Sequence, residues 1–211
     1  MIPLYDETTK NSPPFLTTLL IALNIIVFLI TFPNLEEIVY KFGFVPRDFF
    51  QKKSFFPLFS SLFLHGSLWH LIGNMWYLWI FGGKIEKTFK KFFYLIFYFL
   101  CGIVSTLTFA IFSSQKNLPL IGASGAISGI LGAYARFFSK NKIRCLNFFG
   151  FFWGIISLPA GVFLFLWLLY QFLLSFFQIL PQIATLAHIG GFLCGFAFAK
   201  IFKKWSKFSL I

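Results

Sequence analysis

The chain has 211 residues, of which 58% are hydrophobic and only 11% are charged, and its mean hydropathy is +0.82. A soluble domain carries about a quarter of its residues as charged side chains, because its surface must be wetted. The composition therefore excludes an ordinary soluble domain and favours a helical membrane protein. The net charge of +12 does not indicate a nucleic-acid-binding protein, because the basic residues lie in short clusters between apolar stretches.

Six apolar segments are candidates to cross a bilayer whose hydrocarbon layer is about 30 Å thick. They cover about residues 15–32, 68–82, 92–112, 122–138, 146–172 and 183–202. We therefore expect an all-α fold, a polytopic membrane bundle of six transmembrane helices that forms one domain over residues 1–211. The long connection at residues 33–67 is too rich in Phe for a hydrated loop, and part of it is expected in the membrane interface.

Clusters of Lys and Arg predict the orientation of the chain in the membrane. The clusters lie at residues 84–91, 136–144 and 200–207, and all three fall on one side if the six spans alternate. That side is expected to be cytoplasmic, which places both termini in the cytoplasm. The first 14 residues lack the basic leader of a signal peptide, and the predicted location is a bacterial inner (plasma) membrane.

The distribution of acidic residues and cysteines excludes several functional classes. All six carboxylates are predicted to lie outside the spans, which argues against an aspartyl intramembrane protease and against a small ion-coupled transporter. No His-Glu-x-x-His motif is present. Cys101, Cys145 and Cys194 are scattered without metal-ligand spacing or an even count for a disulfide framework. No metal and no cofactor are predicted.

The polar residues that remain lie at the starts of three predicted spans. His65, His70 and Asn74 lie at the second span, Ser124 opens the fourth, and His188 is near the start of the sixth. These three spans run in the same direction, so their first turns are expected at one depth near the outer leaflet. Polar groups are costly there unless partnered, and their presence suggests function.

Small residues at helical spacing predict that the fourth and sixth spans pack closely. Gly125 and Gly129 form a stripe on one span, and Gly191 and Gly195 form a stripe on the other. Such stripes let two membrane helices approach backbone to backbone. This packing would bring the hydroxyl above one stripe to the imidazole above the other, the arrangement of a nucleophile and its base. General-base assistance of this kind contributes roughly 10²–10⁴-fold to a rate.

The same region offers donors for a negatively charged tetrahedral intermediate. Ser124 lies at a helix start, where backbone N–H groups are unpaired and the helix dipole favours negative charge. His70 and Asn74 are one turn apart on one face of the second span and can add side-chain donors.

Three motifs together resemble the rhomboid family of intramembrane serine proteases. They are FLHGSLWHLIGNM at residues 63–75, GASGAISG at 122–129 and AHIGGFLCG at 187–195. The resemblance implies Ser124 as nucleophile, His188 as general base, and an oxyanion site completed by His70 and Asn74. It also implies structural support from His65 and Gly122. The implied partners are the lipid bilayer and transmembrane protein substrates that enter sideways past the fifth span, with no nucleic acid and no metal.

Two departures from the family pattern and two alternatives accompany this prediction. Family members often carry Trp-Arg upstream of the first histidine, where this chain has Phe56 and Pro57. Many have an aromatic residue four positions after the nucleophile, where this chain has Ser128. Taken alone, GASGAISG is also explained as a close-packing stripe. The alternative function is a non-catalytic rhomboid-fold protein that binds membrane clients.

Overall fold

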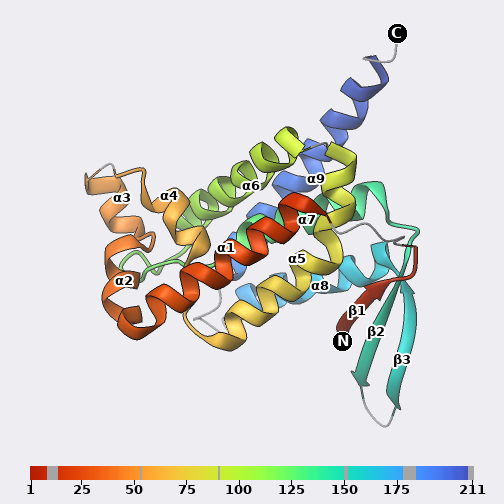
Figure 1. Cartoon of the computed structure of the whole chain (residues 1–211), viewed down its shortest axis with the longest axis horizontal. Helices are drawn as coiled ribbons and strands as arrows, with labels where there is room; N and C mark the ends of the chain where they lie inside the picture. The colour runs from red at the N-terminus through yellow and green to blue at the C-terminus, as the bar shows by residue number, and fades with distance from the viewer. Residues whose placement is uncertain (9–13, 53, 90, 150–151, 178–183, 209–211) are drawn as a thin grey trace.

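The structure is a computed structural model, and it describes residues 1–8, 14–52, 54–89, 91–149, 152–177 and 184–208. Most of the chain is helical, and a small β-sheet lies to one side of the helical bundle, next to α8 (Figure 1). Residues 150–151 and 183, which belong to the predicted fifth and sixth spans, lie outside the described residues.

Helices cover most of each predicted span except at residues 146–159, and short helices occupy the connection at residues 33–67. They are α1 (Phe15–Thr31), η1 (Phe32–Asn34), α2 (Leu35–Phe42), α3 (Pro46–Lys52), α4 (Pro57–Ser60), η2 (Ser61–Phe63), α5 (Leu68–Phe89), α6 (Lys91–Phe112), α7 (Ser124–Phe137), α8 (Ala160–Phe176) and α9 (Thr185–Phe208). Three described segments are long and apolar enough to cross a membrane: Phe15–Phe42, Lys91–Phe112 and Thr185–Phe202. The prediction of a mostly helical membrane protein is confirmed, whereas the count of six spans stays a prediction.

The all-α prediction is wrong at residues 146–159, the first half of the predicted fifth span. Here β2 (Lys142–Phe149) and β3 (Phe152–Pro159) form an antiparallel hairpin. The edge of β2 pairs with β1 (Ile2–Asp6), which gives the strand order β1-β2-β3. A continuous apolar run does not distinguish a strand from a buried helix by its periodicity. The partner strand β1 is distant in the chain, so no local pattern indicates the pairing.

Helix α7 lies at the centre of the bundle, and this position decides where the site can form. It packs against α9, α6, α5 and α8. Every residue from Gly125 to Tyr134 is buried, on all faces of the helix. A 14-residue helix that is covered on every side by other helices does not need the apolar length of a lipid-facing span. Its first residue, Ser124, therefore starts inside the protein.

The connection before α5 is tied to the segment that precedes α7 by backbone hydrogen bonds. Phe44 forms an isolated antiparallel bridge with Leu120, and the Gly122 N–H donates to the Ser61 carbonyl at 2.8 Å. Large aromatic side chains of this connection are exposed, among them Phe55 and Phe56. Exposed aromatic side chains along this connection fit its predicted place in a membrane interface. These bonds hold the connection against the segment that leads into Ser124.

The prediction that all six carboxylates lie outside the helices of the spans is wrong for Glu86. Helix α5 continues past Gly82, and Glu86 lies within it, with only 6% of its surface exposed. Its carboxylate accepts the backbone N–H groups of Leu16 at 2.9 Å and Thr17 at 2.8 Å, which are unpaired donors at the start of α1. Gly82 allows the start of α1 to lie this close to α5, because a Cβ at Gly82 would lie only 2.9 Å from the Thr17 side chain. Residues 83–89, which the sequence analysis had left outside the second span, therefore continue its helix.

Strand β1 is fixed to the bundle by Asp6. The Asp6 carboxylate pairs with Lys84 of α5 and accepts the Tyr134 hydroxyl of α7, and it also accepts the Thr8 N–H at 2.8 Å. Burial raises the pKa of Asp6, but the hydrogen bonds from Lys84, Tyr134 and Thr8 outweigh that effect and hold the pKa at about 2, below the ordinary 3.8. The charged carboxylate thus stabilises the joint between sheet and helices.

We expect Asp6→Asn to lower the free energy of unfolding by about 2 kcal/mol at neutral pH, which is the linkage value of the lowered pKa. A lowered pKa stabilises the fold above the unfolded-state value of 3.8, and this stability is lost as the pH falls through about 2. The difference in melting temperature between wild type and Asp6→Asn in detergent should therefore be constant from about pH 5 to 8 and shrink below about pH 4. A difference that grows toward acid pH would contradict this account.

Candidate active site

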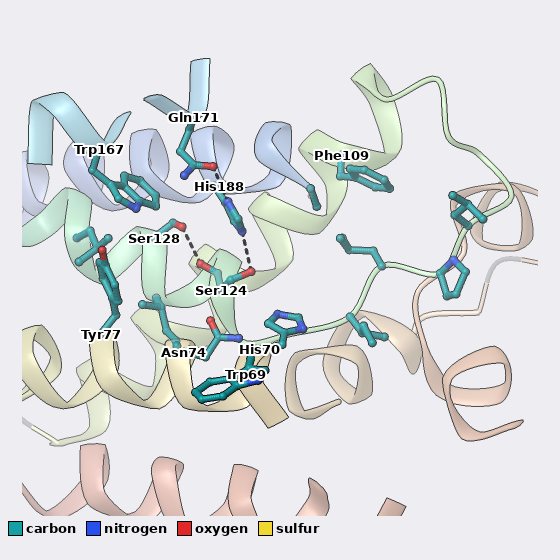
Figure 2. Close-up of a pocket in the computed structure, with 18 of the residues that line it drawn as sticks. Trp69, His70, Asn74, Tyr77, Phe109, Ser124, Ser128, Trp167, Gln171 and His188 are labelled. Carbon is teal, nitrogen blue, oxygen red and sulfur yellow. Dashed lines mark hydrogen bonds between the residues drawn. The ribbon is translucent and has the colours of Figure 1, made fainter. Parts of the chain in front are cut away.

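A cavity of about 730 Å³ opens among α5, α7, α8 and α9. Figure 2 shows the polar side chains that point into it, and they come from all four helices. These side chains are His70 and Asn74 from α5, Ser124 and Ser128 from α7, Gln171 from α8, and His188 from α9. The structure thus brings together the polar residues that the sequence analysis selected on three separate spans.

Ser124 and His188 are hydrogen-bonded across the cavity. The distance from Ser124 Oγ to His188 Nε2 is 2.8 Å (Figure 2). Ser124 is the first residue of α7, and His188 lies in the first turn of α9. A neutral imidazole at this distance can accept the hydroxyl proton, which is the contact that an activated serine requires.

Glycines let α7 and α9 approach closely enough for this hydrogen bond. A Cβ at Gly191 would lie 2.2 Å from the Gly125 carbonyl oxygen, and one at Gly195 would lie 1.9 Å from the Gly129 carbonyl oxygen. These separations are far below van der Waals contact, so any side chain would force the helices apart. The other face of α7 is equally close to α6, because a Cβ at Gly129 would lie 2.3 Å from Cys101 Cβ.

His70 and Asn74 lie next to Ser124, on α5 (Figure 2). Asn74 is buried, and its Nδ2 group has no hydrogen-bond partner among the described residues. An unpaired buried donor costs about 1–3 kcal/mol, so a donor kept in this state beside a cavity indicates a missing acceptor. A carbonyl oxygen of a bound peptide, or the oxyanion that forms from it, is such an acceptor.

His65 and Gly122 contact His70 from two sides. His65 is completely buried, and its ring meets the His70 ring edge-on, with 5.1 Å between the ring centroids. Gly122 has a φ of +116°, a conformation that favours glycine, and a Cβ there would lie 2.8 Å from His70 Nε2. Both residues therefore restrict where the His70 ring can lie, which is consistent with the predicted supporting roles.

The structure places two further residues on His188 that the sequence analysis missed. Gln171 Oε1 lies 2.9 Å from His188 Nδ1, and the Trp167 ring centroid lies 6.1 Å from that of the imidazole. Gln171 is the one amide within residues 160–176. The rule that polar groups at membrane depth suggest function would have selected it.

Ser128, which marks the departure from the family pattern on α7, has its hydroxyl bonded within its own helix. Its hydroxyl donates to the Ser124 carbonyl oxygen at 2.7 Å, one turn back along α7.

Metal-ligating side chains do not gather in the part of the chain that the structure describes. The described residues contain no group of three or more His, Cys, Asp or Glu side chains that could hold an ion.

A family model for the Rhomboid domain matches residues 52–205. The chain belongs to the rhomboid family. The chain is 30% identical to RHOMBOID-like protein 5 of Arabidopsis thaliana over 156 residues, which cover 74% of this chain and 47% of the relative. It is also 30% identical to Rhomboid protease GluP of Bacillus subtilis over 146 residues, 67% of this chain and 28% of the relative.

The relatives differ in activity by name. Inactive RHOMBOID-like protein 8 of Arabidopsis thaliana is 30% identical over 138 residues, which cover 64% of this chain and 35% of the relative. This rhomboid chain spans less than half the length of each of these three relatives. Membership confirms the resemblance and the fold family, and activity must be argued from the residues of the cavity.

We expect Gly122→Ala to destabilise the protein, because alanine rarely adopts the backbone conformation at this position and its Cβ would collide with His70. The cost should be about 1–3 kcal/mol, measured as a lower melting temperature in detergent. Gly154→Ala in β3 is the matched control, since a Cβ there has nothing within 4 Å. Equal melting temperatures for Gly122→Ala and wild type would contradict the account.

Proposed function

We propose that this rhomboid-family chain is an intramembrane serine protease that cleaves transmembrane segments of other membrane proteins. Ser124 is the nucleophile and His188 is the general base. The observation that carries the proposal is the 2.8 Å hydrogen bond between Ser124 Oγ and His188 Nε2 inside a cavity large enough for a peptide segment. A hydrogen-bonded hydroxyl and imidazole in a cavity is the minimal arrangement for acyl transfer.

The chemistry follows from the hydrogen bond between the Ser124 hydroxyl and His188. Ser124 Oγ attacks the peptide carbonyl carbon while its proton moves to His188 Nε2. The tetrahedral intermediate collapses as the imidazolium returns that proton to the leaving amine, which departs and leaves an acyl-enzyme. Water then attacks the ester, with His188 again taking the proton and passing it to Ser124 as the carboxylic acid leaves.

The oxyanion is stabilised by donors next to the nucleophile. Asn74 supplies its unpaired amide N–H, His70 supplies a ring N–H, and the start of α7 supplies backbone N–H groups and the positive end of the helix dipole. Charged donors are absent from this set. The described lining of the cavity contains neither Lys nor Arg. Neutral donors avoid the cost of a permanent charge at membrane depth.

The six predicted spans correspond to α1, α5, α6, α7, α8 and α9 in this proposal. In this proposal Ser124 lies below the outer face of the membrane, because α7, with 14 residues and a length of about 21 Å, is shorter than the hydrocarbon layer of about 30 Å. The proposed orientation has both termini in the cytoplasm, which is supported by the basic clusters at the ends of the helices opposite to Ser124. A bacterial inner membrane is proposed, although one relative is Rhomboid protein 1, mitochondrial, of Saccharomyces cerevisiae.

Substrates are proposed to enter from the lipid, between α5 and α8, because the cavity is lined by both helices. Water must reach the bond to be cut, and a transmembrane helix hides its peptide bonds. The preferred substrates are therefore single-span proteins with weak helix and small residues near the cut. The alternative function is a non-catalytic client-binding protein, and it is kept because one relative is named inactive.

A fluorophosphonate probe on the detergent-purified chain separates the two functions. Wild type should be labelled, Ser124→Ala should lose labelling completely, and His188→Ala should slow it by roughly 10²–10⁴-fold. Ser114→Ala, at an exposed serine outside the cavity, is the control and should label as wild type does. Absence of labelling in folded wild type, while a control serine protease reacts, would favour the client-binding function. Cleavage of a single-span reporter in proteoliposomes should show the same order of variants.

A further inference from the structure

The imidazole of His188 is held at both of its nitrogens. Nε2 faces Ser124 Oγ at 2.8 Å, and Nδ1 faces Gln171 Oε1 at 2.9 Å. Figure 2 shows the three side chains in a row, contributed by α7, α9 and α8. Gln171 is buried, with 6% of its surface exposed, so water does not readily replace it as the partner of Nδ1.

The identity of the Gln171 atom that faces the ring decides what the ring can do. A carbonyl oxygen only accepts, so Nδ1 must carry the ring proton and donate it to Gln171 Oε1. Nε2 of a neutral ring then has a free lone pair and can accept the Ser124 proton. In the opposite tautomer Nε2 would carry a proton, and the imidazole could not act as a base toward Ser124.

A second contact from the same helix restrains the plane of the ring. Trp167 lies one helical turn before Gln171 on α8, and its ring is 6.1 Å from that of His188 between centroids. Trp167 is itself stacked on Phe192 of α9, at 6.0 Å and an interplanar angle of 29°. Since Ser128 is bonded to its own helix, this support comes from α8 and not from α7.

We propose that Gln171 is a positioning residue that selects the reactive tautomer of His188 and fixes its direction, with Trp167 supporting the ring. This inference rests on the proposed protease function. An amide suits the position because it offers an acceptor without a charge. None of the six Asp and Glu side chains lines the cavity, and a carboxylate at position 171 would accept the same ring proton at a desolvation cost, which a Glu variant would show as a lower melting temperature rather than as a lost rate.

The test compares Gln171→Met, which keeps the length of the side chain and removes the oxygen, with Gln171→Glu, which keeps an accepting oxygen. Phe172→Met is the matched control, because it introduces the same side chain one position along α8 at an exposed site. Steady-state cleavage of a single-span reporter gives kcat and KM, and fluorophosphonate labelling gives the rate of serine attack. Rates are measured on the monodisperse fraction, with melting temperatures in parallel.

Gln171→Met should lower kcat and the labelling rate by about tenfold or more, because one hydrogen bond that orders the base is lost, while KM stays within about twofold. Gln171→Glu should restore most of the rate, and Phe172→Met should match wild type. A purely structural role would lower the melting temperature without this separation of kcat from KM and without rescue by Glu.

Several results would overturn the proposal. The first is a kcat of Gln171→Met equal to that of wild type. The second is a loss of kcat in Phe172→Met as large as that in Gln171→Met. The third is a folded Gln171→Glu variant whose kcat is as low as that of Gln171→Met. If Gln171→Met yields no folded protein, Gln171→Glu is compared with Gln171→Leu by the same labelling rates, with the same outcomes. If wild type is labelled and the Gln171 variants are labelled at the same rate, the positioning role of Gln171 is wrong and the protease proposal stands. Unlabelled wild type, indistinguishable from Ser124→Ala, ends the protease proposal.

Discussion

The approach of α7 to α9 without intervening side chains is the constraint on which the site depends. The backbone of one helix lies against the backbone of the other at Gly125 with Gly191 and at Gly129 with Gly195. In a bilayer the hydrophobic effect does not press helices together, so close packing and polar contacts must do so. Because the glycines fix both the distance and the rotation of the two helices, the hydroxyl above one pair and the imidazole above the other have a single relative position. The hydrogen bond of the site is thus a result of packing rather than of loop geometry.

The polar groups of this chain are divided by charge between two regions. The cavity is built from neutral groups: a hydroxyl, imidazoles and amides. The two buried carboxylates are elsewhere, and each is fully supplied with donors, Asp6 by Lys84 and Tyr134, and Glu86 by the start of α1. This division is physically reasonable, because a charge is tolerated in a low-dielectric interior only with direct partners. In the proposed reaction the transient negative charge would therefore form in an uncharged site, whose donors are available to the intermediate.

Family membership alone does not decide what the chain does. Its relatives include one named as a protease and one named as inactive, and both match over much of the same chain. The distinction lies in a few side chains. Here the retained pair of Ser124 and His188, the unpaired Asn74 donor and the buried Gln171 acceptor form a continuous set around one cavity. The proposed protease function gives these groups a use, because the unpaired donor gains an acceptor and the imidazole gains a proton to accept.

Sequence reasoning succeeded for the membrane class and the rhomboid resemblance, because apolar length and short motifs are local properties of the chain. It failed at residues 146–159 and at Glu86. The hairpin is stabilised by β1 from the other end of the chain, and Glu86 is buried by α1, so neither environment is visible in a local window.

The amino-acid sequence by itself selected Ser124 and His188 as the candidate reacting pair, with His70 and Asn74 as candidate donors, and the structure brings all four side chains to one cavity. Only the tertiary structure decided the environment of the base. Gln171 and Trp167 reach His188 from a helix that begins at Ala160, after a hairpin that sequence analysis had assigned to that helix. The rotation of α8 about its axis, and hence the side chains that face the imidazole, depends on packing against α7 and α9. Apolar composition carries no information about that rotation, because lipid-facing and buried positions on such a helix are equally hydrophobic.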